Sequence, residues 1–140
     1  MEDVIAEGGC FCGAVRYRGG LADSRVHFCH CSDCRRSSGG PFLAWTNFDT
    51  EQFEFATGSP GCYESRNAAG ARAHRQFCTD CGTQMTYERP DESVGVWVTV
   101  CSLDEPQRMT PGEHLWTASW LDWLHIDDGL PRHQSGFPED

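Results

Sequence analysis

The sequence contains no lysine, so all 11 residues counted as lysine or arginine are arginines. This absence excludes chemistry that depends on a lysine amine, such as Schiff-base catalysis. Aspartate and glutamate together number 21, and the formal net charge is −10. Because nucleic-acid binding depends on a basic face that contacts phosphates, this charge balance predicts no nucleic-acid partner.

Large aliphatic side chains and phenylalanine are also scarce. Leu, Ile, Val and Phe account for 24 of the 140 residues, a content that at high net charge is usually associated with disorder. Five tryptophans and nine cysteines argue for a folded protein instead. A structural zinc ion stabilises small peptides by about 10–16 kcal/mol, comparable with the whole stability of a typical domain. We therefore expect residues 1–140 to form one domain in which bound metal compensates for a modest core.

Long hydrophobic segments are missing. The sequence has no run of about 18 or more apolar residues and no N-terminal apolar run of the signal-peptide type. We expect a soluble, cytoplasmic protein without a membrane partner. In a reducing compartment, clustered cysteines are more often metal ligands than disulfides, and cysteines two or three residues apart are poor disulfide partners.

Short alternating segments separated by glycine, proline and asparagine predict an all-β fold of antiparallel strands with few helical turns. One helical turn is expected at 33–38, ended by Gly39. Trp116, Trp120, Trp123 and Leu124 have helical spacing, which predicts a helical turn or two over the core, with a ligand-stacking platform as the alternative. The polar tail at 131–140 is expected to be loosely held. The expected strands are 4–12, 14–18, 25–29, 42–48, 52–55, 61–65, 73–77, 83–87 and 94–101.

Two cysteine pairs have the spacing of one closed zinc site. Cys78 and Cys81 are three residues apart on a predicted turn, and Gly82 permits the positive φ that such a turn often needs. Cys10 and Cys12 lie on one side of an extended segment. Four thiolates complete a tetrahedron, so we expect these pairs to share one structural metal ion. The alternative is two buried thiol pairs without metal.

The third cluster consists of Cys29, Cys31 and Cys34. Three thiolates leave a fourth zinc position for an exchangeable ligand, which is typical of a catalytic site. His30 points away from the cysteines if the segment is extended, and Asp33 is a further candidate for this position. A second closed site remains the structural alternative, completed by one of these two residues or by a distant cysteine.

The remaining cysteines, Cys62 and Cys101, lie in strand patterns and are expected to be small buried apolar residues unless one of them completes the second site. Arg35 and Arg36 directly follow Cys34. Cations at this place lower the pKa of a thiol and can bind carboxylates. Ordinary surface arginines are the alternative interpretation.

Four segments of the chain carry a family resemblance: 9–15, 29–36 with Gly39 and Pro41-Phe42, 77–83 and 114–131. Together they resemble the glutathione-dependent formaldehyde-activating enzyme family, which also includes centromere protein V. The resemblance covers about residues 4–131 and implies a zinc-stapled β-tent, a fold shared with the B-type methionine sulfoxide reductases and a Rab exchange factor. It also implies two Zn²⁺ per chain: a structural ion at Cys10, Cys12, Cys78 and Cys81, and a catalytic ion at Cys29, Cys31 and Cys34.

The resemblance implies a zinc-dependent carbon–sulfur lyase that forms or cleaves S-hydroxymethylglutathione or a related glutathione adduct. Arg35 and Arg36 are the expected partners of the glutathione carboxylates, and Gly39 and Gly40 are expected to let backbone N–H groups approach the ligand. A non-catalytic glutathione carrier or zinc-dependent interaction module is the main alternative. A sulfoxide reductase is a third hypothesis, and it requires a redox cysteine away from zinc, for which Cys101 is the candidate.

Overall fold

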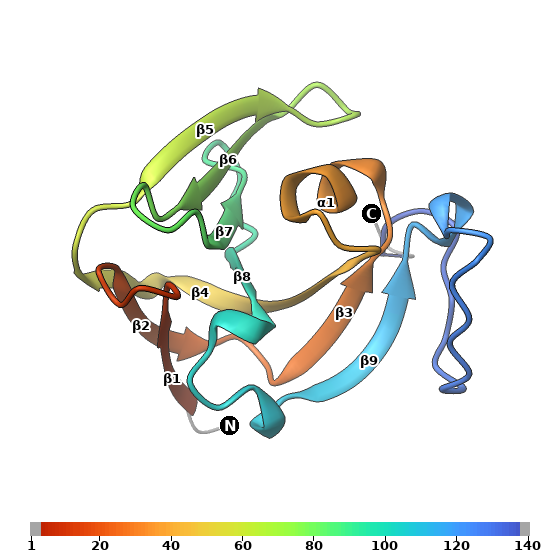
Figure 1. The fold of residues 1–140 in the computed structure, drawn as a ribbon, viewed down its shortest axis with the longest axis horizontal. Coiled ribbons are helices and arrows are strands. Elements are labelled where there is room, and N and C mark those ends of the chain that lie inside the picture. Colours follow the sequence, from red (N-terminus) through yellow and green to blue (C-terminus); the bar gives the residue numbers. More distant parts are fainter. Residues whose placement is uncertain (1–3, 138–140) are drawn as a thin grey trace.

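Antiparallel strands make up most of the chain. A computed structural model describes residues 4–137 and shows nine strands, one short α-helix and three 3₁₀ turns in this range (Figure 1). The predicted all-β class with few helical turns is confirmed. The strands are β1 Val4–Gly9, β2 Arg16–Leu21, β3 Arg25–Cys29, β4 Leu43–Thr57, β5 Gly61–Arg66, β6 Arg72–Phe77, β7 Gln84–Glu88, β8 Val96–Thr99 and β9 Thr110–Leu115, and the helix is α1 Ser32–Ser38.

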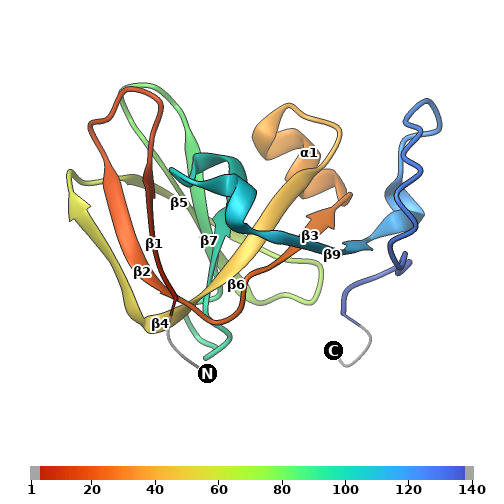
Figure 2. The ribbon, with the colours of Figure 1, turned by 90° about the horizontal axis from the view of Figure 1, so that it is seen from below.

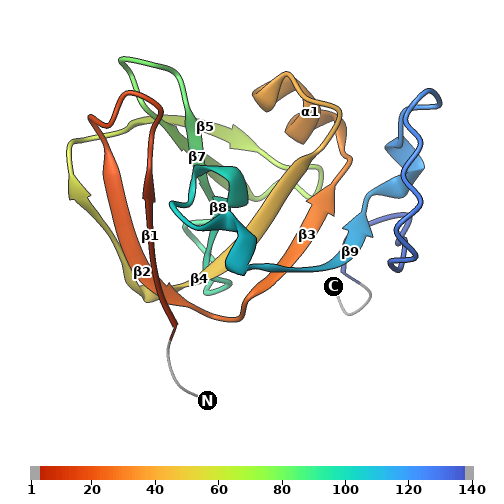
Figure 3. The same cartoon turned by 60° about the horizontal axis from the view of Figure 1, so that its bottom comes forward.

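One long strand, β4, organises the sheet. The strand order is β1-β2-β4-β8-β7-β6-β5, and β3 joins the sheet through β4 and pairs in parallel with β9. The first residues of β4 pair with β3 and β8, whereas residues 48–57 pair with β2. Figures 2 and 3 show β4 crossing the molecule between the β1–β2 hairpin and the β3–β9 pair. No helix among the described residues is long and apolar enough to cross a membrane.

Several predicted element boundaries are wrong. The segments 42–48 and 52–55 are not separate strands, because β4 continues through both. The strand expected at 94–101 ends at Thr99, and Val100–Ser102 forms a 3₁₀ turn. Strand β9 was not predicted, because Pro111 and Gly112 are typical of turns. Pro111 is compatible with β9 because this strand pairs with β3 on one edge, and the bridge to the C-terminal tail on its other edge is at His114, away from Pro111.

The tryptophan-rich segment is not an α-helix. Trp116 has left-handed backbone angles, with φ 57° and ψ 41°, and it is followed only by a 3₁₀ turn at Thr117–Ser119. The backbone of this segment pairs instead with the C-terminal tail, since Trp116 N–H donates to the Ser135 carbonyl at 2.9 Å. Trp120 stacks on His30, with ring centroids 4.1 Å apart, whereas Trp123 is 68% exposed. The predicted helical turn is therefore present only as the 3₁₀ turn at Thr117–Ser119 and does not extend over the rest of the segment.

The polar tail is better ordered than its composition suggests. His133 N–H donates to the His114 carbonyl at 2.9 Å, and the Phe137 ring stacks on Trp97 with centroids 5.8 Å apart. The expectation of a loosely held tail is thus wrong for residues 131–137. Residues 138–140 lie outside the described part of the chain.

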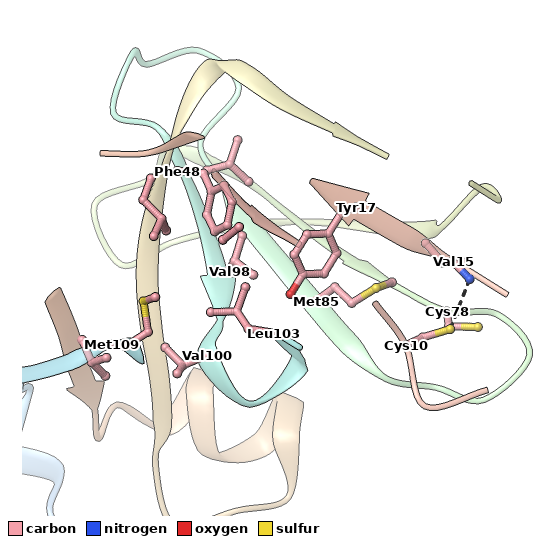
Figure 4. Close-up of a cluster of buried hydrophobic side chains, with 14 residues drawn as sticks. Cys10, Val15, Tyr17, Phe48, Cys78, Met85, Val98, Val100, Leu103 and Met109 are labelled. Atoms are coloured by element: carbon pink, nitrogen blue, oxygen red, sulfur yellow. Dashed lines mark hydrogen bonds between the residues drawn. The ribbon is translucent and has the colours of Figure 1, made fainter. Parts of the chain in front are cut away.

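The main core lies on one face of the central strands. Phe48 of β4 and Val98 of β8 have no exposed surface, and Met85 of β7 and Tyr17 of β2 pack with them. Figure 4 shows this cluster, with Cys10 and Cys78 at one end of it. Complete burial of such side chains contributes about 1.5–3 kcal/mol each to folding.

The opposite face of the same strands carries a smaller cluster. Residues that are directly opposite on neighbouring strands share a face, and Cys29 pairs with Leu43 while Asn47 pairs with Trp97. His27 shares this face because it precedes Cys29 by two positions. The buried members of the cluster are Cys29, Cys34 and Trp45. The sheet therefore separates the main core from the three-cysteine group.

Candidate metal centres

The first candidate centre joins two turns that are far apart in the sequence. The sulfur atoms of Cys10, Cys12, Cys78 and Cys81 all lie within 4.8 Å of one another. One pair lies between β1 and β2, and the other lies between β6 and β7. Cys12 Sγ is 3.6 Å from Cys10 Sγ and 3.7 Å from Cys78 Sγ. The structure thus brings together the two pairs that the sequence predicts to share one site.

The two turns of this centre have similar local geometry. Gly13 N–H donates to the Cys10 carbonyl at 3.1 Å, and Gly82 N–H donates to the Cys78 carbonyl at 2.8 Å. Both glycines have positive φ, 82° and 81°, which side chains disfavour. Val15 N–H also donates to Cys10 Sγ at 3.2 Å. Such N–H donors favour the thiolate form of a cysteine.

The second candidate centre lies where β3 runs into α1. Cys29 is the last residue of β3, Cys31 is the N-cap of α1 and Cys34 lies in the first turn of that helix. Their sulfur atoms lie within 4.8 Å of one another. Cys34 N–H donates to Cys31 Sγ at 3.3 Å. Cys29 and Cys34 are buried, whereas Cys31 is partly exposed, so the group is open to solvent on the Cys31 side.

Both groups fit a metal ion by their chemistry. The thiol of Cys29 donates to Cys31 Sγ at 3.4 Å, which raises the pKa of Cys29 and lowers the pKa of Cys31 to about 2. Ionisation of one thiol in such a cluster thus opposes ionisation of the next, and a divalent cation removes this opposition. Sulfur ligands about 2.3 Å from zinc lie about 3.8 Å apart in a tetrahedron, close to the separations observed in both groups.

The fourth position of the three-cysteine group is not filled by another candidate ligand. No histidine, aspartate, glutamate or further cysteine of residues 4–137 joins this group. His30 is fully buried, and its Nε2 lies 2.9 Å from His114 Nδ1, so it faces away from the sulfur atoms as predicted. Asp33 is exposed in the first turn of α1. His114 Nε2 donates in turn to Asp128 at 2.7 Å.

The two remaining cysteines are exposed, which contradicts the prediction of burial. Cys62 lies on β5, which pairs only with β6 and therefore has an open edge, and Cys101 lies in the 3₁₀ turn after β8. The alternating pattern around Cys101 continues past the end of the strand and so suggested burial. Neither residue belongs to a sulfur group, so neither completes the second centre.

The arginines and glycines after Cys34 occupy different positions in α1. Arg35 is partly buried, and its Nε is buried without a hydrogen-bond partner among the described residues, whereas Arg36 is exposed. Gly39 ends the helix with φ 75°, and its N–H donates to the Arg35 carbonyl at 2.7 Å. Gly40 N–H donates to Ser38 Oγ at 3.1 Å. Both glycine N–H groups are thus engaged within the end of the helix.

Aromatic residues around the three-cysteine group were not predicted as part of the site. Trp45 is buried beside it, and Tyr87 and Trp97 pack against the same cluster. The Arg75 guanidinium lies 4.8 Å from the centre of the Tyr87 ring, and its Nη1 donates to Ser37 of α1 at 3.4 Å. These residues are distant from the cysteines in the sequence. One indication of this arrangement is present in the sequence: Trp97 alternates with the valines of β8, which predicts that its side chain points to the opposite face of the sheet.

The family of the chain follows from comparison with known proteins. The model of the glutathione-dependent formaldehyde-activating enzyme family matches residues 5–119, a segment that contains all seven clustered cysteines. The chain belongs to this family. A solved structure of a Rhodobacter sphaeroides protein covers 90% of this chain and 98% of its own, with a TM-score of 0.56 and 19% identity. At this identity the likeness concerns the fold alone.

Two curated relatives carry names that describe an enzyme. An uncharacterised lyase of Schizosaccharomyces pombe is 29% identical over 85 residues, which cover 58% of this chain and 56% of that protein. The match thus spans little more than half of that relative. A Halomonas elongata protein is 27% identical over 145 residues, which cover 98% of this chain and 91% of that protein. Its name describes a proposed glutathione-dependent formaldehyde-activating enzyme.

Metal removal should distinguish the two centres. We expect two zinc ions per chain, because each sulfur group fits one. The four-cysteine group joins the turns after β1 and β6, so its ion can leave only with partial unfolding. The ion of the partly exposed three-cysteine group can leave locally. Native mass spectrometry under mild chelation should show a folded intermediate with one zinc ion, and simultaneous loss of both ions would contradict this assignment.

Matched cysteine-to-serine variants should divide in the same way. Cys78→Ser should unfold or precipitate the protein, because it opens the closed centre beside the main core. Cys31→Ser should lose one zinc ion and keep its far-ultraviolet circular dichroism, since serine is a good helix N-cap and preserves the start of α1. Zinc analysis and urea unfolding measure both effects. Equal destabilisation by the two variants would mean that both centres are structural.

Proposed function

We propose that the protein is a zinc-dependent carbon–sulfur lyase that forms or cleaves S-hydroxymethylglutathione or a related glutathione adduct. The observation that carries this proposal is the difference between the two sulfur groups. One contains four cysteines, and the other contains three and is partly exposed at Cys31. Membership of the glutathione-dependent formaldehyde-activating enzyme family and the lyase name of one relative support the same chemistry.

Cys29, Cys31 and Cys34 are the residues that would hold the catalytic zinc ion. When bound, such an ion supplies one further coordination position, which favours a thiolate over a thiol at neutral pH. In the synthetic direction, the glutathione sulfur forms a bond with the formaldehyde carbon, and the electron pair of the C=O bond moves to oxygen. The proton lost by the thiol ends on that oxygen. Cleavage is the reverse of these changes.

The surroundings of the three-cysteine group suit a charged thiol substrate. Glutathione carries two carboxylates, and Arg35 and Arg36 lie on the helix that also carries Cys34. We assign them to substrate carboxylates, with Arg35 held more firmly because it is partly buried. Trp45, which is buried in the same cluster as Cys29 and Cys34, would limit the access of water from beneath the group. Substrate would therefore approach from the exposed side of Cys31.

Formaldehyde and thiols also react spontaneously, so catalysis is tested at equilibrium, as an acceleration of exchange above the rate measured without protein. Exchange spectroscopy with ¹³C-formaldehyde and glutathione measures the interconversion of free and adduct carbon. The wild-type protein should accelerate exchange in a saturable manner, Cys31→Ser should abolish this acceleration, and Cys101→Ser should retain it. An effect of Cys101→Ser equal to that of Cys31→Ser would point to redox chemistry instead.

The role of the thiol can be tested by comparing glutathione with its S-methyl derivative. Both compounds present the same carboxylates, but a thioether is a much poorer zinc ligand than a thiolate. Glutathione should bind more tightly, and its affinity should rise from pH 6.5 to 8 because ligation requires loss of the thiol proton. Calorimetric titration measures both effects. Equal, pH-independent affinity for the two compounds would favour a carrier that holds glutathione through arginines alone.

A further inference from the structure

A second feature of the site face is a cavity of about 240 Å³, which is lined in part by Trp97, a residue that also packs against the cluster of Cys29, Cys34 and Trp45. Strands β3, β8 and β9 contribute to its wall, and the C-terminal tail closes one side through Phe137. Figure 3 shows β3 and β9 side by side, with the described end of the chain returning toward this pair. The residues of the cavity that carry the argument are Asp23, Arg25, His27, Trp97, Glu113 and Phe137.

The cavity and the three-cysteine group occupy neighbouring parts of one surface. Arg25, His27 and Cys29 alternate along β3 and therefore point to the same face. Side chains two positions apart on a strand are separated by roughly 7 Å. Trp97 lies against the cysteine cluster and also lines the cavity. A ligand whose sulfur lies at the cysteines can therefore extend along β3 into the cavity.

The charges of the cavity suit a group that carries both an ammonium and a carboxylate. Glu113 is only 7% exposed, and its Oε2 lies 3.1 Å from the Arg25 guanidinium. Its Oε1 lies 3.4 Å from His133. The Asp23 carboxylate accepts a hydrogen bond from the backbone N–H of Arg25 at 2.7 Å, which holds this carboxylate at the cavity. Two carboxylates and one exposed guanidinium are complementary to an α-amino acid zwitterion.

His27 is an independent indication that the cavity receives a ligand. Its ring is nine-tenths buried, and no hydrogen bond joins it to any residue of the described chain. The ring is held edge-on against Trp97 and Phe137, with centroids 4.9 and 5.1 Å away. Its ring nitrogens are not among the fully enclosed polar atoms of the described residues that lack a partner, so they keep some accessible surface at the cavity. A polar imidazole fixed at the cavity wall without such a partner is available to a bound molecule.

We propose that this cavity binds the α-amino acid end of the γ-glutamyl residue of glutathione. Asp23 and Glu113 would receive its ammonium group, and Arg25 would receive its carboxylate. About seven covalent bonds join the sulfur to the α-carbon of that residue, and they span roughly 9 Å when extended. Along β3, His27 lies roughly 7 Å from Cys29 and Arg25 roughly 13 Å from it, so this reach brings the α-carbon to the His27 end of the cavity. The inference rests on the proposed function, because it takes glutathione as the thiol.

The same placement assigns the two ends of glutathione to different parts of the protein. Arg35 and Arg36 lie beyond Cys29 in the chain, on the helix that begins at Ser32, whereas the cavity lies at the start of β3. The glycine carboxylate would therefore extend toward α1 and the γ-glutamyl end toward Arg25. A thiol without an amino acid end would lose the contacts in the cavity.

The test uses two thiol-free peptides, so that binding to the cavity is measured separately from binding through sulfur. The first is γ-glutamyl-α-aminobutyryl-glycine, and the second is the same compound with glutaryl in place of γ-glutamyl, which removes only the amine. Zinc-loaded protein is titrated by nuclear magnetic resonance, and the Trp97 indole signal is assigned by its loss in Trp97→Phe. The wild-type protein should bind the amine-containing peptide about tenfold or more tightly, with a shift of this signal.

Variants of the two acids should remove the preference for the amine. In Asp23→Asn and Glu113→Gln, the two peptides should differ by less than about threefold in affinity, because a neutral amide no longer favours the ammonium group. Glu105→Gln, at an exposed glutamate outside the cavity, should behave like the wild type. Asp23 is exposed, so its variant tests the inference even if Glu113→Gln destabilises the protein.

The outcomes separate this inference from the proposed function. Equal binding of the two peptides to the wild type, or no shift of the Trp97 signal, would overturn the cavity assignment. If glutathione binds no more tightly than its thiol-free counterpart, the zinc–thiol chemistry fails. The amine preference and its loss in Asp23→Asn would still support the cavity in that case. Zinc content measured for each variant shows that both centres are intact.

Discussion

Crowding of sulfur atoms is the constraint on which the rest of this structure depends. Four thiols from two distant turns lie within 4.8 Å of one another, and three more lie equally close at the start of α1. Thiolates this close repel one another unless a cation is present. A metal ion bound at the first group would fix the β1–β2 turn against the β6–β7 turn, and with it the two sides of the sheet. In a chain with so few large aliphatic residues, such a link would be a substantial part of the stability.

The sheet also keeps stability and chemistry apart. Phe48 and Val98 point to one face, where they form the main core, and Trp45 and Trp97 point to the other. Because side chains alternate along a strand, the paired segments 45–48 of β4 and 96–99 of β8 supply side chains to both faces. A substitution at the site face therefore leaves the core contacts in place. This arrangement lets the three-cysteine group remain accessible without opening the interior.

Strand β3 connects the features that bear on function. It begins beside the charged cavity at Arg25, continues through the buried ring of His27 and ends at Cys29. Its parallel partner β9 supplies Glu113 opposite His27. The three-cysteine group and the cavity thus have a fixed separation, set by a hydrogen-bonded strand rather than by a loop. A rigid spacing of this kind favours substrates of one length.

The sequence by itself determined the class of fold, the two sulfur groups and the turn at Gly82, because these depend on local spacing and on the preference of zinc for clustered thiolates. It also indicated correctly that His30 points away from the cysteines. The helical spacing of Trp116 and Trp120 corresponds only to one 3₁₀ turn, since hydrogen bonds from the distant tail hold the backbone of this segment. Strand β9 was hidden because a proline is acceptable only where an edge is left open, and the sequence does not show which strands are edges.

Only the tertiary structure decided which residues surround the three-cysteine group and the cavity. Trp97 and Glu113 come from β8 and β9, and they reach β3 through strand pairings whose register is not encoded by any motif. The burial of Cys62 and Cys101 was predicted wrongly for the same reason, because exposure depends on what covers an edge or a turn. Cysteine spacing is a local property that a few neighbouring residues specify. The cavity beside it is a property of packing, which exists only when distant segments meet.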